Sequence, residues 1–195
     1  MKMEGELRNI NKTLNVKELA LHILDIAQNS ITAGAKNIEV SIVEDEGANN
    51  LTIRVEDNGC GMSEEMVRKV TDPYVTSRTT RKVGMGIPLL KHSAEQAGGA
   101  LSIESEPGKG TKLQASFERD HIDKPVLGDI AGVITILIGS NPDIRFQYHH
   151  KKNNESFNID TKEINETLEG IPINEPEVLK FIKEMIRENL KELEG

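Results

Sequence analysis

The sequence predicts an α/β protein, a two-layer α/β sandwich in which helices cover one face of a mostly antiparallel mixed sheet. Two pairs of alternating segments have the length and pattern of β-hairpins, and an amphipathic segment precedes the first pair. Two further helical segments separate the pairs. An order of helix, strand pair, two helices and strand pair packs most simply as a layer of helices on a sheet.

The first predicted helix begins near Asn15 and ends near Ala33. Asn15, with Glu18 three residues later, matches a capping box. A stripe at helical spacing follows, made of Val16, Leu19, Ile23, Ile26, Ala27 and Ser30. This stripe is expected to face the sheet.

The first predicted hairpin joins strands around residues 38–42 and 51–55 through the polar loop "EDEGANN". A short helix is expected near residues 63–70. A longer helix is predicted in "GMGIPLLKHSAEQAGG", because Pro88 suits a first helical turn and the paired glycines suit its exit. The segments "ALSIES" and "TKLQASF", joined by the turn "EPGKG", form the second hairpin.

Composition argues against several classes of function. The 195 residues contain no run of 18 apolar residues, and the start, "MKMEGELRNINKT", lacks the apolar core of a secretory signal. The net charge of −8 and the 3% of aromatic residues give no support to general nucleic-acid binding. Cys60 is the only cysteine, which excludes an intrachain disulfide. A cytoplasmic protein without a membrane or nucleic-acid partner is therefore expected.

Polar residues of the first helix share an arc opposite its apolar stripe, and they are Glu18, His22, Asp25, Asn29 and Thr32. This arc is either the solvent-exposed face of a surface helix or the wall of a site. In the second case, Asn29 offers an amide oxygen suited to Mg²⁺. Asp25, one turn earlier, offers a carboxylate that could take a proton from a water or from a partner's hydroxyl. His22 and His92 are expected at the surface or at a cleft edge.

The stretch "VEDNGCGM" follows the second strand and is either a hairpin bend or a ligand-binding turn. Gly59 and Gly61 permit backbone angles, or a close ligand approach, that a side chain would forbid. An ionised aspartate only accepts hydrogen bonds, so Asp57 could select an amino group such as that of adenine. Cys60 is expected to be a small residue that fills the bend.

The segment "DPYVTSRTTRKVGMGIPLL" is either a flexible surface loop or a lid over an anion. Gly84 and Gly86 lead into a helix whose free N–H groups can hold phosphate. Arg78, Arg81 and Lys82 lie just upstream and could supply counter-charge.

Taken in order, "DIAQN", "DNGCGM", "GMGIPLL" and "GKGT" resemble the N, G1, G2 and G3 boxes of the GHKL superfamily, whose ATP-binding domains share the Bergerat fold. The resemblance covers roughly residues 15–118. It is closest to the branch of histidine kinase-like ATP-binding domains and anti-sigma-factor serine kinases.

The resemblance implies ATP and Mg²⁺ as cofactors. Asn29 would coordinate Mg²⁺, Asp57 would bind the adenine amine and Thr111 would support the adenine through water. Asp25 would be the base, at a position where the superfamily's ATPases usually carry glutamate and many histidine kinases carry asparagine. The implied nucleotide-binding residues are Asn29, Asp57, Gly59, Gly61, Met62, Arg78, Lys82, Gly84, Met85, Gly86, Ile87 and Thr111.

Three parts are expected along the chain: an N-terminal extension (1–14), the ATP-binding domain (15–119) and a small α/β appendage (120–195). In the appendage, "LGDIAGVITILIGSNPD" reads as a buried helix or strand and "IRFQYHHKKNNESFNID" as a hairpin. A short helix capped by Asp160 follows, and a last helix starts near Asn174. Its apolar stripe forms core packing or a partner or dimer face and consists of Val178, Phe181, Ile182, Met185 and Ile186.

Three functions remain open. The favoured one is a stand-alone kinase that passes the γ-phosphoryl group of ATP to a separate protein, with Asp25 as base. The alternatives are an ATP-hydrolysing switch, whose lid closure changes a homodimer or partner interface, and a non-catalytic nucleotide sensor. About 15 residues precede the first helix, which is too few for the dimerisation hairpin of a sensor kinase, so autophosphorylation on an internal histidine is not expected.

Overall fold

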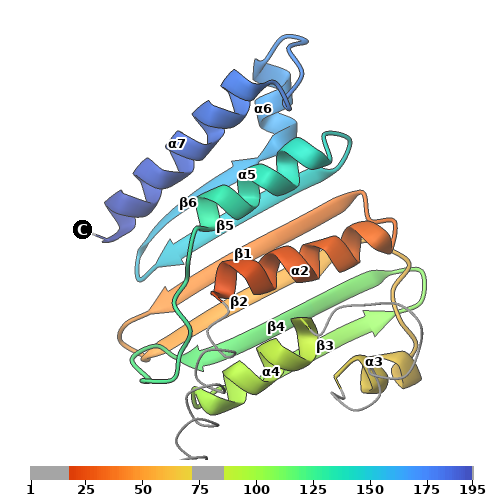
Figure 1. The fold of residues 1–195 in the computed structure, drawn as a ribbon, viewed down its shortest axis with the longest axis vertical. Helices are drawn as coiled ribbons and strands as arrows, with labels where there is room; N and C mark the ends of the chain where they lie inside the picture. Colours follow the sequence, from red (N-terminus) through yellow and green to blue (C-terminus); the bar gives the residue numbers. More distant parts are fainter. Residues whose placement is uncertain (1–17, 72–85, 195) are drawn as a thin grey trace, which may run out of the picture.

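The computed structural model describes residues 18–71 and 86–194. The described strands are β1 (Asn37–Asp45), β2 (Asn50–Asp57), β3 (Leu101–Glu106), β4 (Gly110–Glu118), β5 (Arg145–Lys152) and β6 (Glu155–Asp160). Within these residues they form one six-stranded sheet in the order β3-β4-β2-β1-β5-β6 (Figure 1). Neighbouring strands are antiparallel except β1 and β5, which are parallel. The predicted mostly antiparallel mixed sheet is confirmed.

The described helices are α2 (Leu19–Thr32), α3 (Glu64–Val70), α4 (Gly86–Gln96), α5 (Ile130–Ser140), α6 (Thr161–Thr167) and α7 (Pro176–Glu194). Helix α2 lies across one face of the sheet between α5 and α4, and α7 covers the part of that face formed by β5 and β6 (Figure 1). The apolar residues of these helices and of the inner sheet face form one buried cluster. Helices on one face of the sheet confirm the predicted two-layer α/β sandwich.

The local signals in the sequence explain most boundaries. In β2 every second residue from Leu51 to Val55 is buried, as alternation of apolar side chains requires, and in β1 Ile38, Val40 and Ile42 are buried in the same way, with Ser41 buried between them. Ser63 caps α3 by accepting a hydrogen bond from the Met66 N–H, and Asp160 caps α6 through the Lys162 N–H. The predicted cap Asn15 lies outside the described residues, and Glu18 occupies the N-cap position of α2.

The segment after β4 returns to the same sheet. The apolar stretch that could be helix or strand is helix α5, whose N-cap Asp129 accepts a hydrogen bond from the Gly132 N–H. Strand β5 then pairs with β1 along its whole length, so that β5 and β6 extend the sheet. The last helix starts at Pro176, close to the predicted start. The buried cluster includes residues before and after position 120.

The apolar stripe of α7 divides into two parts. Ile182 and Ile186 are buried, and Val178 and Met185 are partly buried against the core. Phe181, in contrast, is 65% exposed. The prediction of core packing is therefore confirmed for most of the stripe and is wrong for Phe181, which lines a groove beside α6.

Candidate functional site

The carboxylate of Asp57 is held from two sides. Asp57 ends β2, next to Ser30 in the last turn of α2. The Ser30 hydroxyl donates a hydrogen bond of 2.6 Å to Asp57 Oδ2, and the Gly59 N–H donates one of 2.8 Å to Oδ1. Ser30 is only 4% exposed. A carboxylate oriented in this way presents its remaining lone pairs in a fixed direction, which suits the recognition of a ligand amino group.

The hydroxyl of Ser105 connects the turn after β2 to the start of β4. Ser105 Oγ of β3 accepts a hydrogen bond from the Met62 N–H at 2.8 Å and donates one to the Gly110 carbonyl at 2.9 Å. It also lies 2.9 Å from Thr111 Oγ1. Thr111 is in turn the register partner of Asp57 in the β2–β4 ladder. The structure therefore brings Asp57, Met62 and Thr111 together at one end of the sheet.

Two glycines make this arrangement possible. Gly61 has φ +65°, and a Cβ there would fall 2.0 Å from the Glu106 carbonyl oxygen. A Cβ on Gly110 would fall 1.9 Å from the Asp57 carbonyl oxygen. The turn after β2 thus packs backbone to backbone against the β3–β4 turn, where only glycine fits. Cys60 is exposed in this turn.

Asp25 and Asn29 lie one turn apart on α2, and both are partly exposed. The start of α4 packs directly against Asp25. A Cβ on Gly86 would fall 2.9 Å from Asp25 Cβ and 3.1 Å from its Oδ2. The N-terminus of α4, which starts at Gly86 and continues with Ile87, therefore faces the polar side of α2. The unpaired N–H groups of a helix start favour anions, so this corner of the molecule suits phosphate groups.

His22, on the predicted polar arc of α2, is placed differently from the prediction. His22 is 1% exposed, so it is not a surface or cleft-edge group. The reason is that α2 lies between α4 and α5, so that more of its circumference is covered than the helical wheel assumes. His92 on α4 is exposed, as expected. Arg78, Lys82, Gly84 and Met85 of the predicted lid lie outside the described residues, as does Arg81.

Three further residues shape the site, although they were not identified as functional from the sequence. Ser30 is a hydroxyl inside an apolar stripe, and Ser105 is a hydroxyl on the inward-facing side of β3. Buried hydroxyls need partners, so a polar residue at an inward position indicates a specific contact. Asn58 is the third, because its Oδ1 accepts hydrogen bonds of 2.8 Å from the N–H groups of Lys36 and Asn37. These two hydrogen bonds connect the turn to the start of β1.

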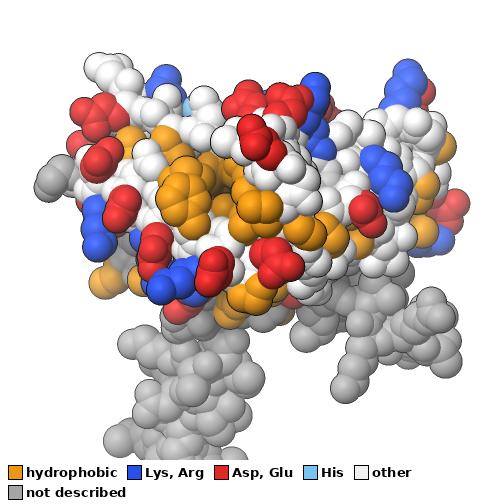
Figure 2. All heavy atoms as spheres, turned by 90° about the horizontal axis from the view of Figure 1, so that it is seen from above, with side chains coloured by type: hydrophobic (Ala, Val, Ile, Leu, Met, Phe, Trp, Pro, Cys, Tyr) orange, Lys and Arg blue, Asp and Glu red, His pale blue; other side chains and the backbone are white. Residues whose placement is uncertain are grey.

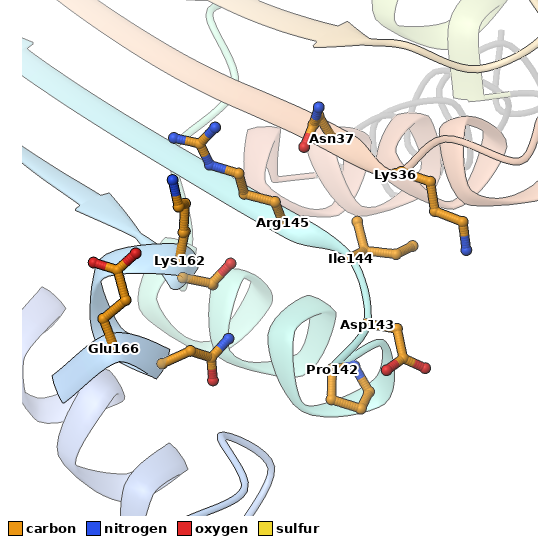
Figure 3. Close-up of a pocket in the computed structure, with 10 residues that line it drawn as sticks. Lys36, Asn37, Pro142, Asp143, Ile144, Arg145, Lys162 and Glu166 are labelled. Carbon is orange, nitrogen blue, oxygen red and sulfur yellow. The ribbon is translucent and has the colours of Figure 1, made fainter. Parts of the chain in front are cut away.

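A cleft of about 540 Å³, with several charged residues in its lining, opens at the same end of the sheet, where β1 and β5 begin (Figure 3). Lys36, Arg145 and Lys162 line it together with acidic groups that include Glu166. The Arg145 guanidinium binds the carboxylate of Asp160 and lowers the pKa of that group. The cleft contains charges of both signs and none of the predicted site residues, and it adjoins the Asp57 turn through Lys36 and Asn37, whose N–H groups bind Asn58.

Among the described residues, no group of three His, Cys, Asp or Glu side chains is placed to hold a metal ion. An amide oxygen such as that of Asn29 suits Mg²⁺ when phosphate oxygens and waters complete the coordination shell. The donor set on α2 therefore fits a metal that arrives with a nucleotide.

Comparison with known proteins defines the class that this fold and site represent. Residues 14–121 match the model of the family described as histidine kinase-, DNA gyrase B-, and HSP90-like ATPase. The chain belongs to this family. It contains a histidine kinase-like ATP-binding domain of the GHKL superfamily.

Individual relatives agree with this assignment. The chain is 32% identical over 91 residues to sporulation kinase C of Bacillus subtilis, covering 47% of this chain and 21% of the relative. It is 25% identical over 117 residues to the autoinducer 2 sensor kinase/phosphatase LuxQ of Vibrio cholerae, covering 57% of this chain and 14% of the relative. The chain thus spans about a fifth or less of the length of these two relatives.

The fold is shared with a solved structure, the N-terminal domain of a DNA repair protein. The two agree with a TM-score of 0.53 at 16% identity, over 77% of this chain and 54% of the other. This likeness concerns the fold alone. Among the described helices, none combines the length and apolar character needed to span a bilayer.

Proposed function

We propose that the protein is a kinase that transfers the γ-phosphoryl group of Mg²⁺-bound ATP to a separate protein. The observation that carries this proposal is the placement of Asp25 against Gly86, at the start of α4, where free helix N–H groups favour anions. A carboxylate at this point can accept the proton of an incoming hydroxyl or imidazole. The similarity to sporulation kinase C adds support from sequence.

In this proposal α2 provides contacts at both ends of the nucleotide. Ser30 orients Asp57, which accepts a hydrogen bond from the adenine amino group. Thr111 pairs with Asp57 across the ladder and contacts Ser105, and in this proposal it supports the adenine through water. Asn29 supplies an oxygen ligand to Mg²⁺, and the ion neutralises charge on the phosphates. Met62, Gly59, Gly61, Ile87 and the lid residues complete the proposed nucleotide set.

The proposed transfer is an in-line displacement. The acceptor atom attacks the γ-phosphorus, the bond from that phosphorus to the bridging oxygen breaks, and ADP leaves. Asp25 takes the proton that the acceptor loses. Helix α4 directs its N-terminal N–H groups toward the phosphates, which stabilises the charge that they carry.

The test uses the purified full chain, Mg²⁺ and ATP labelled at the γ-phosphate, with and without a heat-treated cell extract that lacks active kinases. Label on an extract protein is the expected result. Release of free phosphate alone would replace the kinase by an ATP-hydrolysing switch, and nucleotide binding without either product would replace it by a sensor. The Asp57→Asn variant is the control, because it removes the proposed adenine contact without touching the phosphate end.

A further inference from the structure

The groove between α6 and α7 is apolar and open to solvent. Its volume is about 240 Å³, and most of its lining is hydrophobic. Phe181 lines its edge with 65% of its surface exposed, and Leu168, the C-cap residue of α6, lies among the lining residues. Figure 2 shows the end of the molecule formed by these helices, where hydrophobic side chains surround a hollow. Small-molecule sites usually exceed about 300 Å³, so the groove suits a single large apolar side chain better than a cofactor.

Acidic side chains border the groove on both walls. Glu163 of α6 lines it directly. On α7, Glu177 and Glu184 are four residues before and three residues after Phe181, so they lie on the same side of the helix. In the described part of the chain, none of these three glutamates forms an ion pair. Glu163 is attracted to Arg145 at longer range, behind that arginine's main partner Asp160, so its charge is only partly compensated, and Glu177 and Glu184 are exposed to solvent.

The basic residues of α7 are directed elsewhere. Lys183 and Arg187 lie 3.6 Å and 3.7 Å from Asp129 Oδ2, at the start of α5. Lys180 is the exception: it lies 100° around the helix from Phe181, exposed to solvent, three residues after Glu177 and four before Glu184. The groove side of α7 is thus acidic and apolar, while two of its basic side chains hold the helix to the rest of the fold.

We propose that this groove binds an amphipathic helix of a partner protein that carries an apolar anchor flanked by lysine or arginine. Binding of a helix in a groove uses apolar residues at intervals of three and four, which the groove between two helices can accept. The acidic borders select basic flanks through charge complementarity. This proposal does not depend on the proposed kinase activity, because the groove lies beside β6, at the opposite edge of the sheet from β3.

A second copy of this chain is a poorer occupant. Two grooves that face each other would bring the borders around Glu163 and Glu184 together, and each chain has a net charge of −8. Like charges placed in contact oppose association. A basic partner removes this repulsion and leaves the apolar contact.

The test measures fluorescence anisotropy with the full chain and an 18-residue labelled peptide of leucine and lysine, with leucines along one helical face. A permuted peptide of the same composition has no continuous apolar face. We expect the permuted peptide to bind at least 10-fold more weakly. Equal affinity for the two peptides would overturn the proposal, since it would show only attraction between opposite net charges.

Variants locate the binding to the groove. Phe181→Ala should raise the Kd of the amphipathic peptide at least 10-fold, whereas Ile136→Ala, at an exposed position on α5, should not. Glu163→Lys should weaken binding more than Glu155→Lys, which changes the net charge equally outside the groove. Unchanged affinity in Phe181→Ala would overturn the proposal. Phe181 is mostly exposed, so its variant should keep the wild-type circular dichroism spectrum.

Sedimentation of the free protein tests whether a second copy of the chain occupies the groove. A monomer is expected at micromolar concentration. A wild-type dimer that Phe181→Ala converts to a monomer would show that a second copy occupies the groove, which would overturn the proposal of a basic partner.

Discussion

Ser30 Oγ lies 2.6 Å from Asp57 Oδ2, so a residue of the first helix orients the acid that ends the second strand. The bond is almost fully buried on the serine side and joins two residues that are 27 positions apart. It links the α2 wall, which carries Asp25 and Asn29, to the turn that carries the glycines. The bond therefore connects the proposed adenine contact to the helix that carries Asp25 and Asn29.

Asp57→Asn should raise the Kd for ATP about 100-fold, because the amide would turn one acceptor oxygen into a donor facing the adenine amine. Ser30→Ala should raise it about 5-fold, since it removes the hydrogen bond that orients the carboxylate. Isothermal titration at fixed Mg²⁺ measures both. Wild-type affinity in Asp57→Asn would contradict the proposed adenine contact.

Asn29→Ala should remove most of the Mg²⁺ dependence of ATP binding while leaving a weaker, metal-independent affinity. The reason is that Asn29 supplies the proposed protein ligand to the ion. Titrations with and without Mg²⁺ measure the ratio of the two affinities. Gln28→Ala, at the adjacent exposed position, is the matched control and should keep the wild-type ratio. A wild-type ratio in Asn29→Ala would exclude the metal role.

Asp25→Ala should keep ATP binding within about 3-fold of wild type and lower turnover by 100-fold or more, since general base catalysis contributes about 10²–10⁴-fold. The comparison of binding with turnover separates a base from a binding residue. Turnover at the wild-type rate would show that another group takes the proton.

The local elements of the fold could be predicted because their signals are short in sequence. The two hairpins follow from alternation, and the caps at Ser63 and Asp160 follow from the residue types that accept hydrogen bonds from helix N–H groups. The site turn could be located for the same reason, since Asp57 and its glycines are adjacent in the chain. The order of the motifs along the chain then indicated that this turn belongs to the same site as Asp25 and Asn29 of α2.

The long-range contacts could not be predicted in the same way. The parallel pairing of β1 with β5 joins segments about 100 residues apart and leaves no local pattern. The burial of His22 depends on two neighbouring helices, and the partners of Ser30 and Ser105 depend on strand register. Sequence periodicity shows which face of an element is inward, but it does not show what lies opposite.

Gly61→Ala should destabilise the fold by about 2 kcal/mol or more. The substitution adds strain at φ +65° and places a methyl group 2.0 Å from the Glu106 carbonyl oxygen. Gly108→Ala is the matched control, because φ is +79° there but a Cβ would meet nothing within 4 Å. Strain alone should cost Gly108→Ala about 1 kcal/mol. Urea denaturation compares the two, and equal losses would show that the close approach of the two turns is unimportant.

The hydrogen bond between Glu44 and His150 makes part of the stability dependent on pH. His150 Nε2 lies 3.1 Å from Glu44 Oε1, while its Nδ1 lies 2.7 Å from the Tyr148 hydroxyl. A carboxylate only accepts, so Nε2–H donates to Glu44. The bond from His150 lowers the pKa of Glu44 below its ordinary value of 4.5, which favours the ionised form in the folded state.

Because the pKa of Glu44 is lower in the folded than in the unfolded chain, its contribution to stability is complete above about pH 4.5 and is lost as the pH falls through the folded pKa. Glu44→Gln should therefore be less stable than wild type at pH 7, by about 1 kcal/mol, with a difference that shrinks toward pH 3. Urea denaturation at several pH values measures this convergence. Glu39→Gln, on the solvent-facing side of β1, is the control and should give a smaller difference at pH 7, because Glu39 pairs with Arg54 near the surface. A constant difference between wild type and Glu44→Gln from pH 7 to 3 would show that the charge of Glu44 does not contribute.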